Sequence, residues 1–338
     1  MARVKQEDYA YATARIRARE QKLLSRNRLE RLFEMKDYSD AVKIMVEAGY
    51  GNEQIDNRKS GVENLENILS AELLKTYDLI GEMIPDPLVL NLFRKKYDYL
   101  NAKLILKAEA LKVDVTKNLS RLGTIEPAKL LKLIHGRNLN DLPEIFREAI
   151  LASLDSFSVS GDPQMIDFIM DKASYRDMTE EAKASGDNFL VKLVDMLVDT
   201  ANLRILIRSK LLSKPDDFIK NAWISGGSFS GKLYQEMESK GLDKLVEVLK
   251  NLGQEKLAVS LADAIGSPDA ISEVEKILDD YITIVLGQGK FVTMGIEPVI
   301  GYLFFKETEI KNARLIITGV MNKISRETIK ERLRLGYA

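Results

Sequence analysis

Apolar residues recur every three or four positions along most of this chain. Within residues 92–111 these positions are held by Phe93, Tyr97, Leu100, Leu104, Ala108 and Leu111. Such steps place side chains on one face of an α-helix. The strict alternation typical of a half-buried strand is scarce. The sequence therefore predicts an all-α protein.

The same periodicity predicts further helices on both sides of this segment. They cover Tyr9–Leu24, Tyr38–Ala48, Val62–Leu79, Ala128–Ile134, Asp141–Leu154, Gln164–Lys172, Leu233–Lys250, Pro268–Leu286 and Ser325–Leu335. Glycine and proline punctuate the chain between them. The expected breaks are Gly51–Gly61, Pro85–Pro87, Ser213–Gly231, Gly266–Pro268 and Gly287–Gly295.

Three of the predicted helices carry the same surface, written L-[FV]-x4-[DE]-x2-N-[AL]-[KR]-[LI]-[IL]-[LI]. Its polar members are Asp98, Asn101 and Lys103, then Asp199, Asn202 and Arg204, then Glu309, Asn312 and Arg314. The asparagines lie 101 and 110 residues apart. A long internal period indicates repeated helical units. We expect three, over residues 1–116 (with the N-terminal helix), 117–222 and 223–338.

The helix start also repeats. Pro87 and Pro298 each stand fourteen residues before their asparagine, where a first-turn proline is tolerated. The middle copy has Asn188 there, a good N-cap residue. A weaker match follows the first two copies, where Gly123-Thr124-Ile125 resembles Gly227-Ser228-Phe229.

Two readings of the repeated polar face remain open. In the first, each asparagine hydrogen-bonds a neighbouring helix or loop and the charges are solvated. In the second, the carboxylate, amide and cation of each copy form a polar patch that binds a partner, so that the protein carries three such patches. A buried amide needs hydrogen-bond partners, which favours the first reading for the asparagines. For the charges the two readings are about equally supported.

Composition excludes several classes of protein. The 338 residues include 50 basic and 51 acidic side chains, and this balance argues against nucleic acid as a partner. Cysteine is absent, which excludes disulfides and thiolate metal sites and suits a reducing compartment. The N-terminus lacks the apolar core of a secretory signal. Nowhere do about 18 apolar residues run together, so we expect no direct bilayer insertion.

Two features could suggest catalysis. Residues Gly226–Lys232 fit the first seven positions of a phosphate-binding loop, but Leu233 replaces the hydroxyl residue that should bind Mg²⁺. His135 is the single histidine, and it has no accompanying nucleophile motif. We expect an inter-helix loop at the first and a helix C-terminus at the second, with a nucleotide site as the least favoured alternative.

The chain resembles the C subunit of archaeal and bacterial A/V-type rotary ATPases, a relative of the d subunit of the eukaryotic vacuolar enzyme. The resemblance lies in YAYATARIRARE near the N-terminus, in YDYLNAKLILK, DTANLRILIRSK and ETEIKNARLII on the repeated helices, and in GIEPVIGYLFFKE and KISRETIKERLRLGYA. It extends over the whole length. No single motif is diagnostic; the three spacings and both ends together carry the match.

The resemblance implies a funnel of three similar helical bundles around a pseudo-threefold axis. It implies a non-catalytic rotor part of the central stalk, a socket joining the membrane ion-carrying ring to shaft subunits of the D and F type. No cofactor, metal or active site would be needed. The protein would be cytoplasmic and peripheral to the membrane. A helical-repeat adaptor unrelated to rotary motors is the main alternative.

A torque-transmitting part should be stiff, so we expect the apolar stripes of the three copies to be core. They are Leu92/Phe93/Leu104, Leu193/Val194/Ile205 and Leu303/Phe304/Leu315. Docking is expected to use local charge patches. The candidates are Arg15, Arg17, Arg19, Lys22, Arg26, Arg28 and Arg31, with Lys323, Arg326, Lys330, Arg332 and Arg334 near the C-terminus. The alternative, which is slightly favoured, is that these charges form solvated helix faces.

Overall fold

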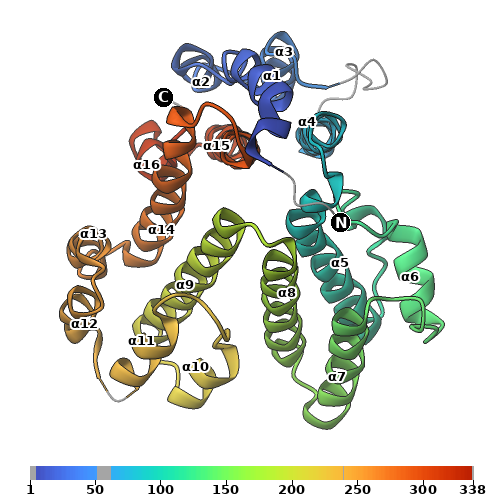
Figure 1. Cartoon of the computed structure of the whole chain (residues 1–338), viewed down its shortest axis with the longest axis vertical. Coiled ribbons are helices and arrows are strands. Elements are labelled where there is room, and N and C mark those ends of the chain that lie inside the picture. The colour runs from blue at the N-terminus through green and yellow to red at the C-terminus, as the bar shows by residue number, and fades with distance from the viewer. Residues whose placement is uncertain (1–4, 52–61, 239, 337–338) are drawn as a thin grey trace. The chain divides into compact units, whose positions relative to one another are not determined.

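The computed structural model describes residues 5–51, 62–238 and 240–336. Within these ranges every regular element is a helix, sixteen α-helices and five short 3-10 helices (Figure 1). The predicted all-α class is confirmed. Among the described helices, none combines the length and the apolar character needed to cross a membrane.

The chain forms two compact units. The first combines Met1–Pro87 with Glu275–Ala338, and the second is Leu88–Val274. The first unit therefore draws on both ends of the sequence. The division into three units, and the pseudo-threefold axis, stay predictions.

The first unit is built around the long helix α15. Its helices are η1 (Gln6–Tyr9), α1 (Ala10–Glu20), α2 (Arg26–Leu32), α3 (Tyr38–Glu47), α4 (Val62–Met83), most of α14 (Ala270–Gly287), η5 (Gln288–Phe291), α15 (Ile296–Met321) and α16 (Arg326–Arg332). The N-terminal helices α1, α2 and α3 all pack on α15, as does α4 (Figure 1). The N-terminal segment is thus part of the core around α15.

The second unit contains the other two repeat helices, α5 and α9. Its helices are η2 (Pro87–Leu90) at the boundary, α5 (Asn91–Leu111), η3 (Thr116–Asn118), α6 (Pro127–His135), α7 (Glu144–Ser160), α8 (Gln164–Ser185), α9 (Asn188–Leu211), α10 (Asp216–Ala222), α11 (Ser230–Met237), η4 (Leu242–Lys244), α12 (Leu245–Asn251) and α13 (Glu255–Ile265). Helices α5 to α8 share a core. In it the rings of Tyr99 and Phe146 pack edge-on, with their centres 4.7 Å apart.

Several predicted helix bounds were wrong. The helix expected over Gln164–Lys172 continues to Ser185, while the one over Leu233–Lys250 is interrupted near Gly241, a residue with poor helix propensity. The expected break Ser213–Gly231 contains α10. Helices α2 and α13 were missed. Most of the expected break Gly51–Gly61 lies outside the described residues.

The predicted helix starts need two corrections. Pro298 lies in the first turn of α15, but Pro87 opens the 3-10 helix η2, and α5 itself begins only at Asn91. Asn188, however, is the first residue of α9 and not its cap. The cap is Asp187, whose carboxylate accepts the N–H groups of Phe189 and Leu190. An acidic side chain at this end also suits the helix dipole.

The predicted apolar stripes were partly wrong. Leu104, Ile205 and Leu315 are only half-buried, and Leu100 and Leu111 are exposed. In each copy the buried positions are those one, four and five residues after the asparagine. They are Ala102, Ile105 and Leu106, then Leu203, Leu206 and Ile207, then Ala313, Ile316 and Ile317. The buried face is rotated from the predicted one, and it contains the asparagine itself.

Candidate functional site

The three repeat asparagines make the same pair of hydrogen bonds. Each side-chain amide donates to the carbonyl, and its oxygen accepts the N–H, of one residue in a following loop. The pairs are Asn101 with Ser120 at 2.8 and 2.7 Å, Asn202 with Ile224 at 2.8 and 2.9 Å, and Asn312 with Arg334 at 2.9 and 3.0 Å. We call each pair a clasp. The reading in which asparagine binds a loop is confirmed, but its expectation of solvated charges was wrong for the carboxylates Asp98, Asp199 and Glu309, which are buried.

Asparagine suits a clasp because its amide carries a donor and an acceptor side by side, matching the two main-chain groups of one residue. All three asparagines are buried, with exposed fractions of 0, 0 and 3%. A buried main-chain N–H or C=O without a partner is destabilising. The clasp therefore gives an irregular loop the hydrogen bonds that a helix or sheet would otherwise supply.

The turn after each repeat helix is repeated as well. Lys112, Ser213 and Lys323 each lie eleven residues after their asparagine and adopt left-handed backbone, with φ of 55°, 51° and 58°. The next N–H bonds back to the helix carbonyl five residues earlier in all three copies. This is the Schellman geometry that ends a helix. The local repeat thus extends beyond the helix surface.

The number of residues between each asparagine and its clasped residue depends on the short helix that lies between them in the sequence. Clasped Ile224 and Arg334 lie 22 residues after their asparagines, and α10 and α16 fill the gap. Ser120 lies only 19 residues after Asn101, because the shorter η3 takes the place of those helices.

The carboxylate of the first copy caps the loop beyond its clasp. Asp98 accepts the N–H and hydroxyl of Thr124 at 2.9 and 2.7 Å and the N–H of Ile125 at 3.0 Å. Its exposed fraction is 2%. Burial raises the pKa of Asp98, although the bonds from Thr124 and Ile125 act in the opposite direction.

The second copy repeats this arrangement with more donors. Asp199 accepts the N–H groups of Ser228, Phe229 and Ser230 at 2.9, 3.2 and 2.9 Å, together with both serine hydroxyls. These residues belong to the phosphate-loop-like segment 226–232. Their N–H groups already surround an anion, the chain's own carboxylate, which argues against a nucleotide phosphate in this loop.

Two glycines allow the carboxylates to approach their loops. A Cβ at Gly123 would stand 2.1 Å from the Asp98 oxygen, and a Cβ at Gly227 would stand 2.2 Å from that of Asp199. Gly227 also has a φ of +81°. The weak similarity between the two Gly-containing segments therefore reflects one shared contact.

In the third copy the carboxylate receives its bonds from the N-terminal segment. Glu309 accepts the N–H of Leu24 and the hydroxyl of Tyr50. Lys306, one helical turn earlier, places its ammonium 2.7 Å from the same carboxylate and 3.4 Å from Glu72 on α4. Burial alone would lower the pKa of Lys306, but Glu309 and Glu72 beside it raise it above the ordinary value.

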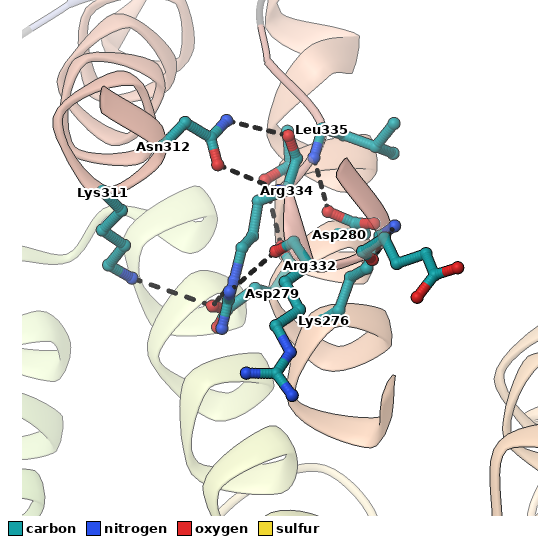
Figure 2. A network of polar contacts seen from close by, with 10 residues as sticks. Lys276, Asp279, Asp280, Lys311, Asn312, Arg332, Arg334 and Leu335 are labelled. Atoms are coloured by element: carbon teal, nitrogen blue, oxygen red, sulfur yellow. Dashed lines mark hydrogen bonds and ion pairs between the residues drawn. The ribbon is translucent and has the colours of Figure 1, made fainter. Parts of the chain in front are cut away.

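Figure 2 shows how the third clasp holds the segment after α16. The Arg334 side chain donates to Asp279 at 3.2 Å, and Lys311 lies 3.9 Å from the same carboxylate. The Leu335 N–H donates to Asp280 at 2.6 Å. Residues after Leu333 therefore leave the helix, and the helix predicted to continue to Leu335 ends at Arg332.

The repeat cations of the first and third copies pair with an acidic residue on another helix of their own unit. Lys103 lies 2.6 Å from Asp171 on α8. The Arg314 guanidinium makes a bidentate contact with the carboxylate of Glu66 on α4, with N–O distances of 2.7 and 2.9 Å. Arg204 is half-buried and lines a groove of about 490 Å³ between α8, α9 and α10. Contact of these cations with a partner stays a prediction.

Several candidates for electrostatic docking are already paired inside the first unit. Arg17 donates to the carbonyls of Gly289, Lys290 and Val292 at 2.8 to 3.1 Å. Arg326 and Lys330 both meet Glu30 on α2. Part of the basic run thus tightens the unit, and docking through the remainder stays a prediction.

His135 is exposed and is the last residue of α6, as predicted. Within the described part of the chain, no three His, Cys, Asp or Glu residues lie where they could hold a metal ion.

Sequence reasoning missed the loop side of every clasp. Ser120, Ile224 and Arg334 share no residue type, because only their main-chain groups are used. Leu24 and Tyr50 lie 285 and 259 residues from Glu309, so no local pattern could connect them. The available signal was the repeated asparagine, which pointed to a partner without identifying it.

The chain is similar to known proteins along almost its whole length. One family model, described as ATP synthase (C/AC39) subunit, matches residues 12–332. The C subunit of the A-type ATP synthase of Methanocaldococcus jannaschii is 24% identical, with 96% of this chain and 86% of the relative aligned. The same protein of Pyrococcus furiosus is 26% identical, over 96% and 89%. The C subunit of the V-type sodium ATPase of Enterococcus hirae is 23% identical, over 95% and 97%.

Proposed function

This chain belongs to the ATP synthase (C/AC39) subunit family, and on that premise we propose that it is a non-catalytic rotor subunit of a V/A-type ATPase or ATP synthase. It would sit in the central stalk as a socket between the membrane ion-translocating ring and the shaft subunits of the D and F type. The three helical copies would then surround a pseudo-threefold axis and form a funnel.

The observation that carries this proposal is the clasp, present three times. Each copy fixes its loop with a buried asparagine, and in the first two copies a buried carboxylate holds the same loop further on, so loops that could fluctuate are held to long helices. Fully paired buried polar groups make a structure specific and rigid. A part that passes torque between two partners needs that rigidity.

The hydrogen-bond partners of the repeat's polar groups also support a non-catalytic scaffold. Catalytic sites use polar side chains that remain available to a substrate. Here the carboxylates and amides of the repeat bind the chain itself, including those beside the phosphate-loop-like segment. The proposal places the protein in the cytoplasm, bound to the membrane through other subunits.

Co-purification tests the proposal. The tagged full-length chain, expressed in its own cells and extracted in mild detergent, should bring down ring and shaft subunits together. An equally tagged soluble helical protein of similar size is the control. Recovery of the chain without rotary subunits would favour the adaptor alternative.

The nucleotide alternative needs a separate assay on the isolated chain. We expect no ATP hydrolysis and no saturable ATP binding, because Asp199 occupies the N–H groups of the loop. Binding that disappears in Lys232→Ala would favour the nucleotide alternative. Lys232 is exposed, so this substitution should leave the fold intact.

A further inference from the structure

The third copy differs from the other two in what completes its carboxylate. Asp98 and Asp199 bind loops 26 to 31 residues further along the chain. Glu309 binds Leu24, which precedes α2, and Tyr50, which follows α3. One carboxylate therefore ties down both ends of the segment 24–50, which contains the α2–α3 pair.

This segment covers buried charge. The Lys306 ammonium lies 4.6 Å from the centre of the Tyr50 ring, and the residue as a whole has an exposed fraction of 3%. Glu72 and Glu309 share the same interior. Removing charges from water opposes much of what their mutual attraction gains. Uncovering the cluster would restore that hydration, which lowers the free energy of opening relative to that of an apolar interface.

The outer edge of the segment is held by surface contacts. Glu30 on α2 pairs with Arg326 and Lys330 on α16. The ring of Phe33 lies 4.9 and 5.6 Å from the same two cations. These groups are partly exposed, so their attraction is screened by salt. The apolar side chains Leu32 and Met45 are buried and keep the segment closed most of the time.

We propose that residues 24–50 form a lid on α15, closed by Glu309, whose opening exposes the charge cluster of Lys306, Glu72 and Glu309. The lid opens as a unit, because both of its ends depend on one carboxylate. Opening of the lid is a local conformational change within the first unit, and the inference does not depend on the proposed rotor function.

Hydrogen exchange of the full-length chain, followed by mass spectrometry, tests the lid. We expect the amides of residues 26–47 to exchange about tenfold faster than those of α15, as in other sub-global openings. Raising NaCl from about 0.05 to 0.5 M should increase exchange in the lid and leave α5 unchanged, because it screens the Glu30 contacts.

Substitutions locate the closure at Glu309. Glu309→Gln should speed lid exchange about tenfold, since a charged acceptor with several donors is lost. The matched control, Asp199→Asn, should speed exchange at residues 224–230 and leave the lid unchanged. Tyr50→Phe keeps the ring over Lys306 and removes one donor, so it should give a smaller acceleration of the lid alone.

The proposal is overturned if lid and α15 amides exchange at one rate in the wild-type protein, or if Tyr50→Phe does not accelerate the lid. Should Glu309→Gln fail to fold, Tyr50→Phe and the salt series still decide.

Discussion

Asn202 and Ile224 share two hydrogen bonds, of 2.8 and 2.9 Å, although 22 residues separate them in the sequence. Both residues are buried. The amide lies on a long helix and the main-chain groups lie in an irregular loop, so the pair joins regular to irregular structure. The same relationship at Asn101 and Asn312 makes it the defining contact of the repeat.

Loss of a clasp should be costly. Asn202→Ala leaves the N–H and C=O of Ile224 buried and unpaired, and we expect a loss of about 2–4 kcal/mol in the free energy of unfolding. Urea denaturation followed by circular dichroism measures it. The control is Asn322→Ala, since Asn322 is exposed and its side chain donates to the Thr318 carbonyl one turn earlier, in α15. That variant should change stability by less than about 0.5 kcal/mol. Equal effects in both variants would contradict the role of the clasp.

A side chain at Gly227 should disrupt the contact with Asp199. Gly227→Ala places a Cβ 2.2 Å from a carboxylate oxygen at a φ of +81°. We expect a loss of at least about 2 kcal/mol, from left-handed strain and the displaced carboxylate together. Gly231→Ala is the matched control, because its Cβ meets nothing within 4 Å and lies in helix α11. It should be neutral or stabilising by up to about 1 kcal/mol. Thermal unfolding compares the two.

The two aromatic residues at equivalent repeat positions should differ. Phe93 is 1% exposed, whereas Phe304 is half-buried. Phe93→Ala should destabilise the protein by about 3–5 kcal/mol, the usual effect of truncating a buried phenylalanine. Phe304→Ala should have a clearly smaller effect. Equilibrium unfolding of both variants tests this. A larger loss of stability at Phe304 would show that the burial of the two side chains does not determine which substitution is more destabilising.

Stability should fall at alkaline pH. Burial and the neighbouring Glu309 raise the pKa of Tyr50 well above its ordinary value of 10.0, and the pKa of Lys306 is raised above 10.5. Above pH 10 the unfolded chain therefore releases protons that the folded chain keeps, which favours unfolding. The contributions are fully present below the ordinary values and are lost as pH rises towards the folded ones.

Each such group contributes a slope of up to about 1.4 kcal/mol per pH unit within its window. Melting temperatures of wild type and Tyr50→Phe between pH 8 and 11.5 measure it. The variant should start less stable and lose stability less steeply. Parallel curves would mean that Tyr50 ionises normally in the folded chain.

The sequence determined the class of fold and the repeated surface. Periods of three and four residues state which side chains can share a helix face, and the positions of Asp98, Asn101 and their counterparts required no tertiary information. The left-handed turn after each helix was not predicted, because it falls on Lys112, Ser213 and Lys323, which are not residue types that favour this conformation. The predicted end of α8 at Lys172 was too early, although Gly186 with its left-handed backbone stands directly after the true end at Ser185 and is a typical helix stop.

The tertiary structure decided which helix face is buried and what each polar residue binds. Leu104 belongs to the predicted stripe but is half-buried, because the asparagine must turn inward to reach its loop. The partners of Glu309 could not be predicted from the sequence either, because the groups that it binds belong to the N-terminal segment. Hydrogen bonds to main-chain groups carry no side-chain signature, and contacts across 285 residues leave no local period. For those, only the folded chain brings the partners together.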